Sequence, residues 1–157
     1  MDPGIDSHAS AVPREEGALL RLTLANERAM LESARLAVVD FLTGRRLSAR
    51  TVFGVELILE EVLTNMIKYA FGDGARHMID VSVQIDPDQV VMQFEDGGLA
   101  FDPLRATAPA TPPTSLDNVV PGGLGLVLLR KFAKTVAYER RDSRNRLTVA
   151  VARDQDR

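Results

Sequence analysis

The stretch Glu61-Val62-Leu63-Thr64-Asn65 decides the fold of this chain, and it lies in a segment with the pattern of a long helix. Ser48 is a favourable N-cap for that helix, and Gly72-Asp73-Gly74 is a suitable end. Between them, apolar side chains recur at helical spacing, at Val52, Val55, Leu59, Val62, Leu63, Met66 and Ile67. Glu61 and Asn65 therefore lie about 40° apart around the axis and roughly 6 Å apart along it, so both can point at one spot.

This pair of side chains suits a metal-assisted site. An amide oxygen such as that of Asn65 is a hard, neutral ligand for Mg²⁺, which keeps several waters and binds substrate phosphates. A carboxylate one turn away, Glu61, can hold such a water or accept a proton from a nucleophile. The alternative is a solvated helix face with an ordinary polar pair, and the helix alone favours that alternative. Asn is a modest helix former, however, and its place between Leu63 and Met66 favours a task for it.

Two glycine-containing segments extend the pattern. Asp96-Gly97-Gly98 directly follows the apolar strand predicted at 90–94. An Asp at a strand end can accept a hydrogen bond from an exocyclic amine, and glycines let a flat base approach the backbone; the alternative is a strand-ending turn. Gly122-Gly123-Leu124-Gly125 opens a helix predicted over 124–134, whose free N–H groups can bind an anion. The alternative there is a hinge before a core helix, and the segment matches neither a P-loop nor a G-x-G-x-x-G fingerprint.

The remaining pattern predicts an α/β (α+β) two-layer sandwich. A strand at 19–24 is followed by two helices, the first capped by Asn26 and ended by Gly44. Hairpins are expected from four further strands, at 78–85, 90–94, 135–140 and 146–151. Hairpins dominate, so we expect a mostly antiparallel mixed sheet with helices packed on one face.

One domain is expected over residues 17–153, preceded by a loose tail at 1–16. The tail mixes Asp, Ser, Gly and Pro with few large apolar residues. Residues 104–121 lack periodicity and are rich in Pro and Thr, and such a long irregular segment in a compact domain is typically functional. We interpret that segment as a lid over the site.

The bulk composition excludes several classes of protein. The chain of 157 residues has no cysteine, so a disulfide framework and thiolate chemistry are excluded. Its formal charge of −3 offers no basic surplus for nucleic acid, and no apolar run approaches the length of a membrane span. His8 and His77 are too few for a metal cluster or a nucleophilic triad. We expect a cytoplasmic protein without a direct nucleic-acid or membrane partner.

In this order, the segments resemble the ATP-site boxes of the Bergerat-fold superfamily, which includes gyrase, heat-shock chaperone, histidine-kinase and mismatch-repair ATPases. Within it the chain most resembles the small anti-sigma-factor serine kinases of bacteria, over roughly Leu19 to Ala152. The resemblance rests on Glu61 to Asn65 with Tyr69-Ala70-Phe71, Asp96 to Pro103, Gly122 to Leu126, Tyr138 to Asp142 and Asn145-Arg146-Leu147.

The resemblance implies ATP and Mg²⁺ as cofactors and gives the residues roles. Asn65 is implied as the Mg²⁺ ligand, and Glu61 as the general base that activates a protein serine, or as a water-positioning residue. Asp96 is implied to bind the adenine amine, with Gly98 beneath the base. Gly123 and Gly125, with Leu124 between them, are implied to meet the phosphates as the lid closes.

The implied activity is phosphorylation of a serine or threonine of an antagonist protein, with control of a sigma factor by partner switching. A homodimer is compatible with it. The alternative is a non-catalytic regulatory module whose lid is ordered by ATP. A free-standing histidine kinase is disfavoured because the chain has no room for a helical domain with a phosphoacceptor His.

The sequence departs from the family pattern at three places. Tyr69 stands where a His is common, Arg105 is the only cation within 104–121, and Ala133-Lys134 replaces a frequently acidic stretch. The arginines between Arg140 and Arg146 are interpreted as a solvated turn.

Overall fold

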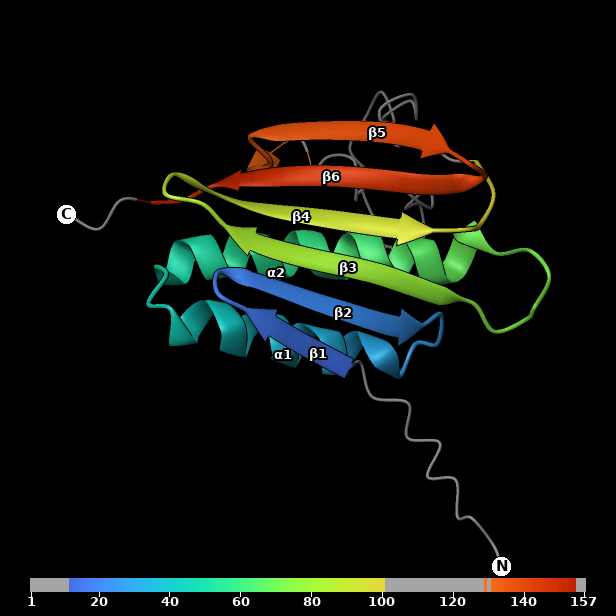
Figure 1. Cartoon of the computed structure of the whole chain (residues 1–157), viewed down its shortest axis with the longest axis horizontal. Coiled ribbons are helices and arrows are strands. Elements are labelled where there is room, and N and C mark those ends of the chain that lie inside the picture. The colour runs from blue at the N-terminus through green and yellow to red at the C-terminus, as the bar shows by residue number, and fades with distance from the viewer. Residues whose placement is uncertain (1–11, 101–128, 130, 155–157) are drawn as a thin grey trace, which may run out of the picture.

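The protein folds as a single sheet of six strands with helices against one face (Figure 1). The structure is a computed structural model, and it describes residues 12–100, 129 and 131–154. The strand order is β1-β2-β3-β4-β6-β5, and each described pair of neighbours is antiparallel. This confirms the predicted fold class. In chain order the elements are β1 (Val12–Glu16), β2 (Leu19–Ala25), α1 (Met30–Gly44), α2 (Ala49–Asn65), a π-helical turn η1 (Met66–Ala70), β3 (Met78–Ile85), β4 (Gln89–Asp96), β5 (Thr135–Arg141) and β6 (Arg144–Ala152).

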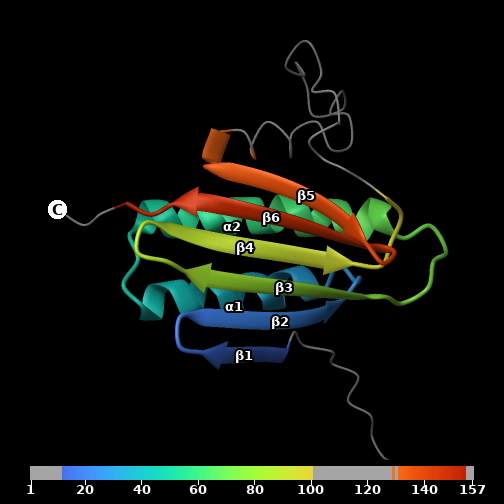
Figure 2. The same ribbon diagram turned by 45° about the horizontal axis from the view of Figure 1, so that its top comes forward.

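The hydrophobic core lies between the sheet and the two helices, which Figure 2 shows on the same side of the strands. Alternate residues of β4 point into it, because strand side chains alternate between faces: Val90, Met92, Phe94 and finally Asp96 are buried. The helices contribute their apolar stripes, including Phe41 of α1 and Ile58 of α2. The residue that ends this buried row is therefore a carboxylate, which needs polar partners inside the protein.

Residues 12–16 form the edge strand β1, although we expected them to belong to the loose tail. They pair with β2 through a two-residue loop in which Gly17 has a φ of 60° and Glu16 lies opposite Leu19. A glycine with positive φ at the first loop position is typical of a type II′ hairpin turn. The strand was missed because main-chain pairing and the turn build it, while its own residues carry little apolar pattern.

The start of α2 is as predicted, whereas the start of α1 is not. Ser48 caps α2, and its Oγ accepts a hydrogen bond from the Thr51 N–H at 3.1 Å. α1 begins at Met30 without a side-chain cap. Asn26 instead accepts a hydrogen bond from the His77 N–H at 2.8 Å, so its side chain joins the end of β2 to the start of β3. A partner so distant in sequence competes successfully with local capping.

The hairpin of β5 and β6 fixes the position of the last strand. Its two turn residues, Asp142 and Ser143, have φ values of 51° and 62°, the conformation of a type I′ turn. β6 lies between β4 and β5, and Asn145 is opposite Asp96 on one side and Arg140 on the other. The turn thus places these three residues in one row across the sheet.

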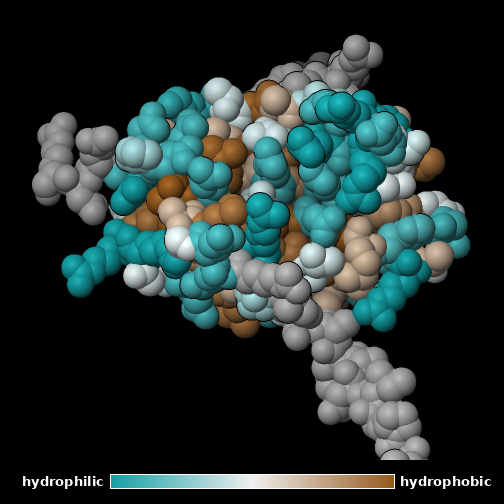
Figure 3. All heavy atoms as spheres, viewed as in Figure 1, coloured by the Kyte–Doolittle hydropathy of each residue, from teal (hydrophilic) through white to brown (hydrophobic). Residues whose placement is uncertain are grey.

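The sheet face away from the helices is largely polar, as Figure 3 shows. It carries a shallow groove of about 770 Å³ bordered by side chains such as Arg21, Asp80 and Glu95. In the part of the chain that the structure describes, no helix is long and apolar enough to cross a membrane.

Candidate nucleotide-binding site

Glu61 and Asn65 lie at the C-terminal end of α2, one turn apart and half-buried, as the helical pattern predicted. Among the described residues, none hydrogen-bonds to either side chain. The helix continues directly from Asn65 into η1, and π-helical turns occur frequently at functional sites. Within the described structure, both side chains thus lie next to this turn without a hydrogen-bonded partner in the protein.

The environment of Glu61 favours proton uptake. Burial raises the pKa of its carboxyl group, and the neighbouring Glu60 carboxylate raises it further, whereas Lys68 acts in the opposite direction. A general base is most effective when its pKa approaches the working pH. Glu61 thus has the direction of shift that a base for a serine hydroxyl needs.

Asp96 ends β4 as a buried carboxylate, with 4% of its surface exposed. Its Oδ1 accepts hydrogen bonds from the Gly98 N–H at 2.8 Å and from Asn145 Nδ2 at 3.1 Å. No described residue donates to Oδ2. Within the described residues, one carboxylate oxygen thus binds the protein and the other receives no hydrogen bond.

Gly98 lies against the end of the helix, where no side chain fits. A Cβ atom at this position would come within 2.2 Å of the Ala70 carbonyl oxygen and 2.8 Å of Asp96 Oδ1. The same Ala70 oxygen accepts a hydrogen bond from the Leu99 N–H at 2.8 Å. The segment after β4 is therefore joined to η1, which begins immediately after Asn65, and the two predicted halves of the site share this junction.

Three residues of the β5–β6 hairpin, Tyr138, Arg140 and Asn145, form a hydrogen-bond network with Asp96 on the strand side of the site. The sequence prediction gave none of them a role. Asn145 is 6% exposed and donates from Nδ2 to Asp96 and, at 2.7 Å, to the Leu99 carbonyl. Its Oδ1 accepts hydrogen bonds from the Tyr138 hydroxyl and from Arg140 Nη1. Arg140 also donates to the Gly98 carbonyl at 3.1 Å. The strands predicted at 135–140 and 146–151 left Asn145 in the turn. A two-residue turn at Asp142 and Ser143 was the signal that would have placed Asn145 in the last strand, opposite Asp96.

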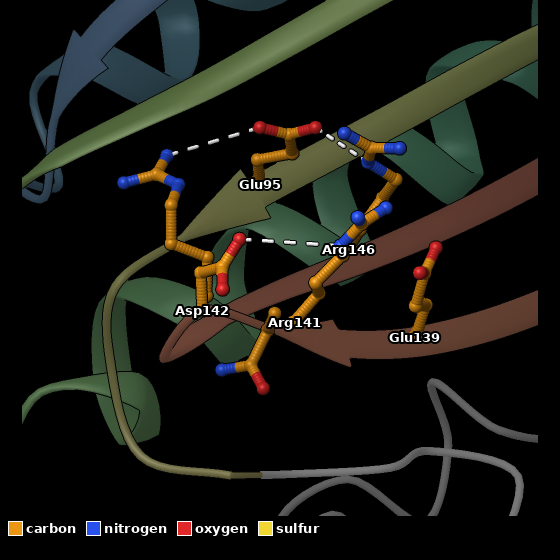
Figure 4. A pocket seen from close by; sticks show the side chains of 7 residues that line it. Glu95, Glu139, Arg141, Asp142 and Arg146 are labelled. Atoms are coloured by element: carbon orange, nitrogen blue, oxygen red, sulfur yellow. Dashed lines mark hydrogen bonds and ion pairs between the residues drawn. The ribbon is translucent and has the colours of Figure 1, made fainter.

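The interpretation of the arginines as a solvated turn needs correction for Arg140. This residue is exposed, but it lies in β5, and its guanidinium also holds the segment after β4. The other arginines point away from the helices. Arg146 pairs with Glu95 and Arg144 with Asp80, and Arg141 lies by Asp142. Figure 4 shows Glu95 and Arg146 joined beside a small pocket of about 160 Å³. That pocket lies next to the Asp96 row but on the open face.

The third predicted segment lies outside the described residues. It comprises Gly123, Leu124 and Gly125, and the lid assigned to 104–121 lies outside them as well. Beyond it, Leu129, Lys131 and Phe132 are helical, and Leu129 is buried in the core. The described part of the helix predicted over 124–134 thus ends at Phe132, two residues before the predicted end.

Residues 24–151 match the family described as the histidine kinase-like ATPase domain. The chain belongs to this family. It is also 38% identical over 104 residues to the serine/threonine-protein kinase BtrW of Bordetella bronchiseptica, an alignment that covers 66% of this chain and 72% of that protein. The two findings confirm the resemblance inferred from the motifs.

The chemistry of the described residues fits the nucleotide of a histidine kinase-like ATPase. The buried Asp96 offers an acceptor at the end of β4, where the absence of a side chain at Gly98 lets the backbone approach η1 closely. Asn65 and Glu61 offer the neutral oxygen and the carboxylate that a Mg²⁺–phosphate complex and a proton transfer need. Membership of the family implies that the protein binds ATP. The roles of the individual residues in ATP binding are proposed below.

Proposed function

We propose that this protein is an ATP-dependent serine/threonine kinase that phosphorylates an antagonist protein and thereby controls a sigma factor by partner switching in the cytoplasm. One observation carries the proposal: the Leu99 N–H donates a hydrogen bond to the Ala70 carbonyl and so joins the segment after β4 to η1. It brings the segment of Asp96 to the end of the helix that bears Glu61 and Asn65. The similarity to a serine/threonine-protein kinase supports phosphotransfer to a hydroxyl group.

Each residue has a distinct task in this proposal. Asp96 would accept a hydrogen bond from the adenine amine, with Gly98 beneath the base. Asn65 would hold Mg²⁺ through its amide oxygen. ATP supplies the phosphoryl group, and Mg²⁺ neutralises charge on its phosphates. Glu61 would take the proton of the attacking hydroxyl, which its raised pKa favours.

Phosphorylation of the antagonist offers a physical basis for the switch. A phosphoserine carries about −1.5 to −2 charge at neutral pH. Placed at a docking surface, this charge would weaken the complex with a protein of formal charge −3. The released protein would then bind the sigma factor through an overlapping surface.

The proposal is tested by incubating the protein with γ-labelled ATP, Mg²⁺ and a candidate antagonist. We expect label on a serine or threonine of the antagonist, and none when Mg²⁺ is chelated. Calorimetric titration with and without Mg²⁺ measures nucleotide binding separately. A protein that binds Mg-ATP and never labels its antagonist contradicts kinase activity.

A non-catalytic ATP-binding module is the second candidate. It is favoured by one observation: the hydrogen-bond network of the described residues is built around Asp96, to which the proposal gives a role in nucleotide binding and none in phosphoryl transfer. In such a module ATP would order the predicted lid and so regulate a partner. Unchanged partner regulation in a Glu61→Gln variant would favour this candidate over the kinase.

A further inference from the structure

The side chain of Asn145 lies at the centre of a network that spans three neighbouring strands. Asp96 is on β4, Asn145 on β6, and Tyr138 and Arg140 on β5. Asn145 is paired with Asp96 on one side and with Arg140 on the other, so these three residues occupy adjacent positions across the sheet. All the hydrogen-bonding capacity of one amide is thereby used inside the protein.

The donors and acceptors around Asn145 allow only one orientation of its amide. Arg140 has only donors, so it must face the amide oxygen, and the Tyr138 hydroxyl donates to the same atom. The Leu99 carbonyl can only accept, and it faces the amide nitrogen at 2.7 Å. The nitrogen must therefore also be the atom that lies 3.1 Å from Asp96 Oδ1.

This orientation decides which carboxylate oxygen Asp96 presents to a ligand. Oδ1 already receives two donors, from Asn145 and from the Gly98 backbone. Within the described structure, Oδ2 receives none. A carboxylate turned out of this plane would leave one of the two N–H groups of Asn145 Nδ2 without its acceptor, at a cost typical of an unsatisfied buried donor.

We propose that Asn145 is a positioning residue that commits Asp96 Oδ1 to the protein and thereby aims Oδ2 at the amino group of the purine base. Tyr138 and Arg140 act through Asn145 by fixing its amide. The inference rests on the proposed role of Asp96 in adenine recognition, and it adds the source of the selectivity for a 6-amino purine.

The test compares two nucleotides that differ at one position of the base. ATP and purine riboside triphosphate, which has hydrogen in place of the 6-amino group, are titrated with Mg²⁺ by calorimetry. A hydrogen bond to a charged group gives the parent protein a preference for ATP of about 10- to 150-fold. We expect Asn145→Ala to reduce this preference to within a few-fold of unity, mainly by lowering the affinity for ATP.

Two further variants separate positioning from packing. Asn145→Asp keeps the shape of the side chain and replaces the donor by an acceptor, so we expect it to lose the preference as well. Arg146→Gln is the matched control: it changes the next residue of β6, which faces the open side and pairs with Glu95. This control should keep the parental preference, even if its melting temperature falls.

A double variant, Tyr138→Phe with Arg140→Met, covers the event that substitutions at Asn145 do not fold. Without these two donors to Asn145 Oδ1, the orientation of the Asn145 amide is no longer fixed. The preference for ATP over purine riboside triphosphate should then fall several-fold. Parental preference in folded Asn145→Ala, in Asn145→Asp or in this double variant overturns the inference and leaves ATP binding intact. No preference in the parent protein itself overturns the role of Asp96 as well, so the two failures are distinguishable.

Discussion

On the strand side of the site, the Asp96 carboxylate accepts hydrogen bonds from the Gly98 backbone and from Asn145, which Tyr138 and Arg140 hold in turn. On the helix side, the described structure gives neither Glu61 nor Asn65 a hydrogen-bonded partner. Asp96 and Asn145 are buried, whereas Glu61 and Asn65 are half-buried. The difference follows from solvation, because a buried carboxylate must be satisfied by the protein, whereas a half-exposed one can use water.

This comparison suggests a division of work between the two sides. A group held by several hydrogen bonds is already in place when a ligand arrives, which favours selectivity for the base. Side chains without such bonds can follow a metal ion and a transferring group. We therefore expect substitutions on the strand side to change ATP binding, and substitutions on the helix side to change turnover, with ATP binding lost as well at Asn65.

The largest effect is expected at Glu61. Loss of a general base typically lowers the rate by about 10²- to 10⁴-fold, so Glu61→Gln should lose turnover while it keeps most ATP affinity. Asn65→Ala should lose both, because the proposed Mg²⁺ ligand is removed. Labelling of the antagonist, together with calorimetry on the same samples, measures the two quantities.

Glu60→Gln is the control for Glu61, since Glu60 is exposed and does not share the four-residue spacing to Asn65. It should retain most of the turnover. If Glu61→Gln labels the antagonist at the parental rate, the base lies elsewhere, and Glu60 becomes the next candidate.

The next largest effect is expected at Asp96. Asp96→Asn removes the negative charge from an acceptor, and a hydrogen bond to a charged group is worth about 10- to 150-fold in affinity. We expect ATP binding to weaken by this order, measured by calorimetry with Mg²⁺. Binding at parental strength would break the comparison, because the strand side would then not be the base site.

A smaller effect on stability is expected at Gly98. In Gly98→Ala the added methyl group would overlap the Ala70 carbonyl oxygen, and overpacking typically costs about 1–3 kcal/mol. The melting temperature should fall by roughly 2–4 °C per kcal/mol for a domain of this size. Gly97→Ala is the matched control, since the nearest atom to its Cβ is Arg144 Nη1 at 3.8 Å. Equal melting temperatures for the two variants would show that the backbone around Ala70 and Gly98 shifts at little cost, contrary to this prediction.

The smallest effect concerns the pH dependence of turnover. A general base must be ionised, so the rate should rise with pH through the pKa of Glu61, at a higher pH than for an ordinary glutamate. Glu60→Gln removes a raising influence and should move this rise to lower pH. Lys68→Gln removes a lowering influence and should move it to higher pH. Rate profiles that shift in the same direction for both variants would contradict the assignment.

Local patterns made most of the fold predictable, and long-range partners explain what was missed. The helix around Glu61, its cap at Ser48 and the presence of the hairpins depend on neighbouring residues, so periodicity and turn chemistry predicted them. The exact turn of the last hairpin was not predicted, because Asn145 was expected between the strands and lies in β6. The role of Asn145 depends on Asp96, 49 residues away, and only the pairing of β4 with β6 brings them together. β1 was missed for a related reason, since its partners belong to β2 and its own residues are mostly polar.

The pairing of β4 with β6 also sets the order in which the site can form during folding. The β5–β6 hairpin is local, and hairpins close within about 1–10 μs. Asn145 can thus acquire its Tyr138 and Arg140 partners early. Its contact with Asp96 must wait until the long segment between β4 and β5 has closed, which carries a larger entropic cost. ATP would then bind only chains that have completed this step, and mass action would draw the folding equilibrium toward them.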